Sequence, residues 1–75
     1  MRKLKEIAKE IDDNWERPYF GAVPYINAMH MVSDIADEYG QDNGEYIVRY
    51  FLGNAQTWRG DVARRIKAEL NGMLK

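Results

Sequence analysis

The sequence predicts an all-α protein, a compact bundle of four short helices that forms one domain over residues 1–75. Apolar residues recur at the three- and four-residue spacing of a helix face in four separate segments. Between these segments lie proline, glycine and other residues that are typical of turns. The length is enough for one domain only, and an apolar fraction of 45% indicates a folded chain rather than a disordered one.

The first helix is expected over about residues 2–15. One face of this segment is apolar, and Lys and Glu occupy the opposite side. The region of Pro18 ends the helix, because the residue before a proline is restricted to extended backbone. The apolar face consists of Leu4, Ile7, Ala8, Ile11 and Trp15.

The second helix is expected over about residues 24–39. Pro24 suits its first turn, where the missing N–H costs no hydrogen bond. Gly40 suits the C-terminal stop. Helical spacing relates Tyr25, Ala28, Met29, Val32, Ile35, Ala36 and Tyr39.

The third helix is expected over about residues 43–55. Asp42 is predicted to cap it, with a carboxylate that accepts a hydrogen bond from the Glu45 N–H. Its apolar residues are Ile47, Val48, Phe51 and Leu52, with Tyr46 and Tyr50 widening the face. A helix that is apolar nearly all round is typical of the centre of a bundle, so we expect this one to be packed on several sides.

The fourth helix is expected over about residues 60–74. Arg59 would fall on its apolar face, so the helix is predicted to begin after that residue. Asp61 is favourable at a helix N-terminus. The apolar face consists of Val62, Ala63, Ile66, Leu70, Met73 and Leu74.

Charge is distributed unevenly along the chain. Residues 18–48 hold five acidic residues and no Lys or Arg, whereas residues 49–75 hold six basic and two acidic residues. The sequence pI of about 5.7 is below that of general nucleic-acid binders. The acidic middle and the basic end are therefore separate candidates for functional surfaces.

The residue types that are absent exclude several classes of function. There is no cysteine, which excludes a disulfide framework and a thiolate metal site. One His and one Ser provide no nucleophile–base arrangement, and no glycine-rich phosphate-binding motif occurs, so we expect no enzymatic activity and no cofactor. His30, Asp34 and Asp37 would share a face of the second helix, but one helix rarely completes a coordination sphere, so no metal site is predicted. No apolar run approaches the roughly 18 residues of a membrane span, and we expect a cytoplasmic protein.

The acidic middle of the chain is the first candidate for a binding surface. Asp37 and Glu38 would lie in the last turn of the second helix, where the helix dipole disfavours anions. Residues that break a local rule in this way often mark functional surface. We therefore predict an acidic face that binds a protein partner by occupying a basic groove meant for phosphates. It consists of Asp34, Asp37, Glu38, Asp42 and Glu45.

Three alternatives remain open. Tyr19 and Phe20 either close one end of the bundle or form an exposed aromatic anchor for a partner. The polar face of the fourth helix is a candidate DNA-binding surface of a helix-turn-helix-like regulator, although we favour a solvated face. A homodimer would supplement the modest core of so short a chain. The candidate DNA-binding residues are Arg59, Arg64, Lys67 and Asn71.

The C-terminal half resembles a group of small proteins encoded by phages and mobile elements of Gram-positive bacteria. The resemblance covers residues 39–75, with a YG turn, an apolar IVRYFLGNA stretch and the segment WRGDVARRIKAEL, and extends loosely to PYINAM at residues 24–29. Small phage proteins of this kind often act as stoichiometric binders of host machinery, including inhibitors of restriction or CRISPR enzymes. The resemblance transfers no catalytic residues and implies a non-enzymatic accessory protein that acts by protein–protein binding.

Overall fold

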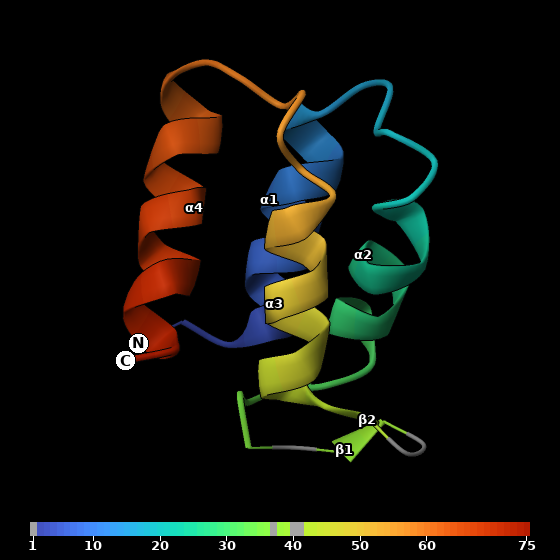
Figure 1. The fold of residues 1–75 in the computed structure, drawn as a ribbon, viewed down its shortest axis with the longest axis vertical. Coiled ribbons are helices and arrows are strands. Elements are labelled where there is room, and N and C mark those ends of the chain that lie inside the picture. The colour runs from blue at the N-terminus through green and yellow to red at the C-terminus, as the bar shows by residue number, and fades with distance from the viewer. Residues whose placement is uncertain (1, 37, 40–41) are drawn as a thin grey trace.

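Four helices follow one another along the part of the chain that the computed structural model describes, residues 2–36, 38–39 and 42–75. They are α1 (Leu4–Asn14), α2 (Val23–His30), α3 (Gly44–Gly53) and α4 (Asp61–Met73). A short antiparallel ladder between β1 (Glu38–Tyr39) and β2 (Asp42–Asn43) precedes α3. The all-α prediction is confirmed, because this ladder has two residues in each strand and forms no layer of its own. α3 lies in front of α1, between α4 and α2 (Figure 1).

The helices enclose an apolar core to which each of them contributes. The radius of gyration is 11.0 Å, which matches the roughly 11 Å expected of a compact domain of this length. Trp15, which was predicted on the apolar face of the first helix, is buried, and so is Trp58. The largest fully buried side chains are Phe51, Leu4, Ile7, Ile11, Met29, Ile66, Leu70 and Val48. No helix in the described ranges is long and apolar enough to cross a bilayer.

α1 and α4 occupy the segments predicted for them. The buried residues of α1 follow the predicted face, with Leu4 and Ile11 at its two ends. α4 begins at Asp61, directly after Gly60, whose φ of 112° lies in the region that favours glycine. Arg59 lies outside the helix and is exposed, so the predicted start is confirmed.

α2 is much shorter than the sequence predicted. It ends at His30, whereas the predicted helix continued to residue 39. The chain turns after α2, and the Ser33 carbonyl accepts a hydrogen bond of 2.9 Å from the Leu4 N–H at the start of α1. Val32 is still buried, but from a turn rather than a helix. Tertiary packing thus buries Val32 without a helix, although the apolar spacing of this segment predicted a longer one.

The start of α3 also differs from its prediction. Asn43 caps the helix instead of Asp42, because the Asn43 Oδ1 accepts a hydrogen bond of 2.9 Å from the Tyr46 N–H. Gly44, the first residue of α3, is buried against the turn that follows α2. A Cβ on Gly44 would lie 2.6 Å from the Asp34 carbonyl oxygen, so only glycine allows this approach.

Ion pairs join the start of the chain to α4. The Arg2 guanidinium donates to both carboxylate oxygens of Glu69, at 3.0 and 2.6 Å, and to Glu10 at 2.7 Å. Arg65 also pairs with Glu10. Hydrogen bonds from Arg65 and Arg2 hold the pKa of Glu10 below its ordinary value, and the bonds from Arg2 lower the pKa of Glu69. The network fixes α4 against α1 and brings the two chain ends together (Figure 1).

Candidate functional site

Exposed aromatic side chains gather along α2, α3 and the connector before α2. Phe20 is 79% exposed and Tyr19 43%, while Tyr46 and Tyr50 on α3 are 52% and 49% exposed. Tyr25 on α2 is half-buried beside them. We call these five side chains the aromatic strip. Clustered apolar surface of this kind is typical of a site that contacts another molecule.

Three tyrosines of the aromatic strip stack on one another. Tyr46 and Tyr50 lie one turn apart on α3, with ring centroids 5.5 Å apart and ring planes inclined by 13°. Tyr25 comes from α2 and stacks on Tyr50 at the same centroid distance, with an inclination of 17°. The neighbouring rings restrict one another, so the three side chains of this stack are held in place on the surface.

Tyr19 and Phe20 extend the aromatic strip past the C-terminal end of α3. Their ring centroids are 4.7 Å apart. Tyr19 lines a surface hollow of about 270 Å³ together with Gly53 and Asn54. Asn54 in turn donates a 2.8 Å hydrogen bond to the Tyr50 carbonyl. The strip therefore follows α3 from its first turn to its end, and the interpretation that Tyr19 and Phe20 are buried in the end of the bundle is wrong.

The charges beside the part of the aromatic strip on α3 are acidic or paired. Glu45, adjacent to Tyr46, forms a 2.9 Å ion pair with Arg49 one turn further along α3. These three side chains and Asn43 line a second hollow, of about 360 Å³. Residues 18–48 contain no Lys or Arg. The strip thus lacks the run of cations that a nucleic-acid-binding aromatic surface carries.

Two residues of the predicted acidic face, Asp34 and Glu45, lie next to this end of the strip. Asp34 and Glu45 are exposed, and the Asp34 carbonyl lies against Gly44 at the start of α3. Asp37 lies outside the described residues, and so do the side chains of Glu38 and Asp42. The helix that was expected to align these acids ends at residue 30. The acidic face itself stays a prediction.

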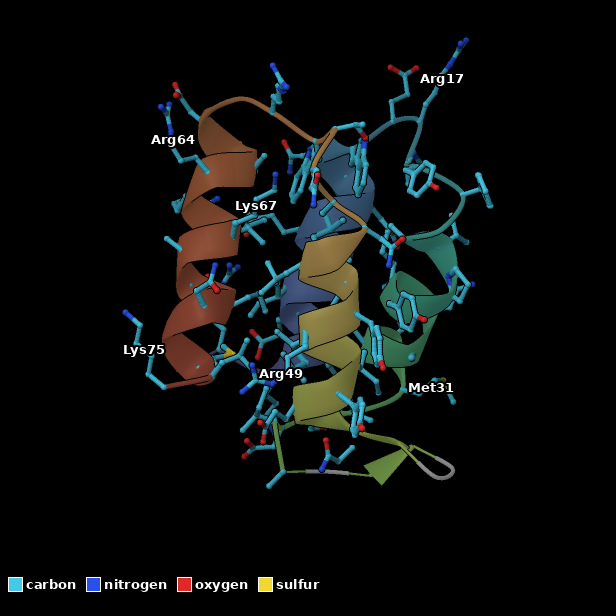
Figure 2. The ribbon with its side chains drawn as sticks, viewed as in Figure 1. Arg17, Met31, Arg49, Arg64, Lys67 and Lys75 are labelled. Carbon is cyan, nitrogen blue, oxygen red and sulfur yellow. The ribbon has the colours of Figure 1, made fainter. Side chains whose placement is uncertain are left out.

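The predicted DNA-binding residues lie on α4 and the loop before it. Arg64 is paired with Asp61. Lys67 donates a 2.6 Å hydrogen bond to the Trp58 carbonyl, and Asn71 donates a 2.9 Å hydrogen bond to the Lys67 carbonyl. Burial lowers the pKa of Lys67, as does the nearby Arg59. A third hollow, of about 360 Å³, is lined by Trp58, Arg59, Gly60, Arg64 and Lys67. Arg64 and Lys67 both project from the upper half of α4 (Figure 2).

His30 has a different role from the one considered for it on a longer helix. Its Nε2 lies 2.6 Å from Asp12 Oδ2, so the side chain joins the end of α2 to α1. Because α2 ends at His30, Asp34 does not continue a helical face with it. Among the side chains that the structure describes, no three His, Cys, Asp or Glu residues gather as potential metal ligands.

Sequence reasoning missed the exposure of Tyr46 and Tyr50. Both were assigned to a helix packed on several sides, and both are instead half-exposed on α3. Tyr46 and Tyr50 each stand one position before a buried residue, Ile47 and Phe51, and therefore share a different face of the helix. That difference in face could have been seen in the sequence. Tyrosine is also typical of binding surfaces, because its ring is apolar and its hydroxyl can be hydrated.

Comparison of the chain with protein-family models, with curated proteins and with solved structures found no match.

Proposed function

We propose that this protein is a non-enzymatic binding module whose contact surface is the aromatic strip. The observation that carries the proposal is the exposure of Tyr46 and Tyr50 on α3 and of Tyr19 and Phe20 in the connector before α2. Tyrosine is enriched in the energetically dominant centres of protein interfaces, because it offers a large apolar ring, few rotatable bonds and a polar hydroxyl.

The proposed partner is a protein surface with an apolar pocket and a basic border. The apolar pocket would take the exposed rings, of which Phe20 is the most exposed. The basic border would face Asp34 and Glu45, which lie where the strip begins at the N-terminal end of α3. The other predicted acids, Asp37, Glu38 and Asp42, precede this end in the sequence and would add to the same complementarity.

The biological setting of the proposal comes from the resemblance of residues 39–75 to small phage and mobile-element proteins. A stoichiometric binder of host machinery needs a ready-made contact surface and no catalytic group. The ordered tyrosine stack meets this need, since little side-chain freedom is lost on binding. We therefore propose an accessory protein that acts in the host cytoplasm by binding, and so inhibiting, a protein of the host.

The proposal is tested with variants that remove aromatic surface without touching the core. Immobilised wild-type protein captures its partner from host lysate, and the affinity of the purified pair is then measured by calorimetry. Phe20→Ser and Tyr50→Ser should each weaken binding about 10- to 100-fold, as expected for residues at the centre of an interface. The matched control is Met31→Ser, which removes another exposed apolar side chain that is 69% exposed and lies beyond the end of α2 (Figure 2).

Folded Phe20→Ser and Tyr50→Ser proteins that bind as tightly as the wild type would exclude the aromatic strip as the contact surface. Self-association is distinguished by light scattering of the isolated protein. A dimer that dissociates in Tyr50→Ser would assign the strip to a second copy of the chain. The DNA-binding alternative predicts a gel shift at low salt that is lost as salt rises.

A further inference from the structure

A hollow lies between α4 and the loop before it, and every charged side chain that is described in its wall is a cation. Arg59, Arg64 and Lys67 contribute to its wall, together with Trp58 and Gly60. Asp61 is adjacent in sequence, but it does not line the hollow and pairs with Arg64. Among the described side chains, no carboxylate enters this wall. This local excess of positive charge stands out in a chain with a net charge of -1.

Two of these cations retain unused hydrogen-bond donors. The Lys67 ammonium has three N–H groups, and one of them binds the Trp58 carbonyl at 2.6 Å. Arg59 has a planar guanidinium with five N–H groups, and within the described ranges it forms no ion pair and no side-chain hydrogen bond. Lys67 and Arg59 are thus held at one hollow with most of their donors free to bind a ligand.

The positive charges of Lys67 and Arg59 also repel each other. Lys67 is half-buried, and Arg59 is close enough for its charge to act on the ammonium. Two like charges at a partly desolvated position raise the free energy of the folded state unless an anion is bound between them. A bound anion would remove this repulsion and use the free donors at the same time.

We propose that Arg59 and Lys67 form a binding site for a phosphate-sized oxyanion, either free phosphate or a phosphate monoester. Guanidinium and ammonium groups are the side chains that bind phosphate oxygens most strongly, the former through two parallel hydrogen bonds. The site takes the charged group without an attached base, because Trp58 is buried against Trp15 and offers no free ring face for stacking. The hollow is separate from the aromatic strip and does not depend on the proposed partner.

Nuclear magnetic resonance tests the site with inorganic phosphate as the probe, at constant ionic strength balanced with chloride. We expect saturable shifts of the Gly60 amide and of the Arg59 side-chain Nε–H. Arg59→Gln should weaken binding about tenfold, as expected when one charge-assisted contact is lost. This variant folds as the wild type, because Arg59 is exposed and forms no described hydrogen bond. Lys67→Gln should weaken binding similarly, and the control Arg17→Gln removes an exposed cation remote from α4 (Figure 2) without effect.

The source of the phosphate is identified by two further ligands. A phosphoserine peptide that binds more tightly than inorganic phosphate would assign the site to a phosphorylated protein, whereas equal affinities would assign it to the free anion. Shifts that do not saturate, or that are equal at Arg17 and Arg59, would overturn the proposal. An oligonucleotide that binds equally well to wild type and Arg59→Gln, while phosphate produces no saturable shift, would also overturn it.

Discussion

Trp15 and Trp58 stack in parallel, with ring centroids 5.3 Å apart and ring planes inclined by only 9°. Trp15 follows the last residue of α1, and Trp58 lies in the loop before α4. Phe51 of α3 meets the Trp15 ring edge-on, at 6.3 Å and 76°. These three aromatic side chains join α1, α3 and the loop before α4 at one end of the core, in the two arrangements that aromatic pairs prefer.

We predict that Trp58→Ala lowers the free energy of unfolding by about 3–5 kcal/mol, because it removes a buried ring and leaves Trp15 without its partner. Trp58→Phe should lose less, since part of the stack is retained. Urea unfolding followed by circular dichroism measures both. The exposed neighbour Thr57 provides the control, and Thr57→Ala should leave stability within about 0.5 kcal/mol of the wild type. Equal stability of Trp58→Ala and the control would contradict the role of the stack.

Gly44→Ala should be destabilising by about 1–3 kcal/mol, the typical cost of overpacking. The added Cβ would lie 2.6 Å from the Asp34 carbonyl oxygen and 2.7 Å from that of Ile35, and backbone cannot move aside as a flexible side chain can. Gly72→Ala is the matched control, because a Cβ there meets nothing within 4 Å on α4. That change should stabilise the protein by about 0.5–1 kcal/mol through the helix propensity of alanine. Thermal unfolding of the two variants should therefore shift in opposite directions.

Stability should fall at acid pH through the ion-pair network of Arg2, Glu10, Glu69 and Arg65. Both carboxyl groups have a folded-state pKa below the ordinary 4.5, so their contribution is present above that pH and is lost as pH falls through the lowered values. Glu69→Gln should cost about 1 kcal/mol at neutral pH and much less at a pH low enough to protonate Glu69 of the wild type.

The measurement is the urea midpoint of wild type and Glu69→Gln as a function of pH. Glu16→Gln is the control, since Glu16 is exposed and lies outside this network. A difference between wild type and Glu69→Gln that stayed constant down to acid pH would show that the lost contact is steric and not ionic.

Charge reversal tests the acidic part of the proposed interface separately from the aromatic part. The double variant Asp37→Lys with Glu38→Lys should abolish partner binding, because a basic border on the partner would then be repelled. Its circular dichroism spectrum should remain that of the wild type. Partner binding that survives the reversal, while Phe20→Ser still prevents it, would restrict the contact to the aromatic strip.

The sequence was sufficient for α1 and α4 because their apolar faces are complete within one segment. Leu4 to Ile11 and Ala63 to Leu70 bury a single stripe each, and the opposite side is charged. The C-terminal end of α2 could not be predicted in this way, because the turn after it contacts a residue that is distant in the sequence. The Ser33 carbonyl binds the Leu4 N–H, and only the folded chain brings the two together.

The candidate site was predicted in part. Tyr19 and Phe20 were named as candidates from the sequence, and both are exposed, whereas their role as an anchor for a partner stays a prediction. Tyr46 and Tyr50 were misassigned because an aromatic ring on a helix can face either the core or the solvent. The stacking of Tyr50 on Tyr25 exists only when the folded chain places α2 beside α3, so it could not be read from the sequence. Lys67 and Arg59 belong together for a similar reason, since a loop and not a helix face places Arg59 at the hollow.

The bidentate contact between Arg2 and Glu69 holds the beginning of the chain close to its C-terminal helix. A short linker between the two ends should therefore yield a circular permutant that folds when it is opened in an exposed loop, such as the one that contains Gln56 and Thr57. The same adjacency determines where a fused domain emerges. Whichever end carries it, the fusion leaves from the lower corner of the bundle, while the connector that carries Tyr19 and Phe20 lies at the upper end (Figure 1).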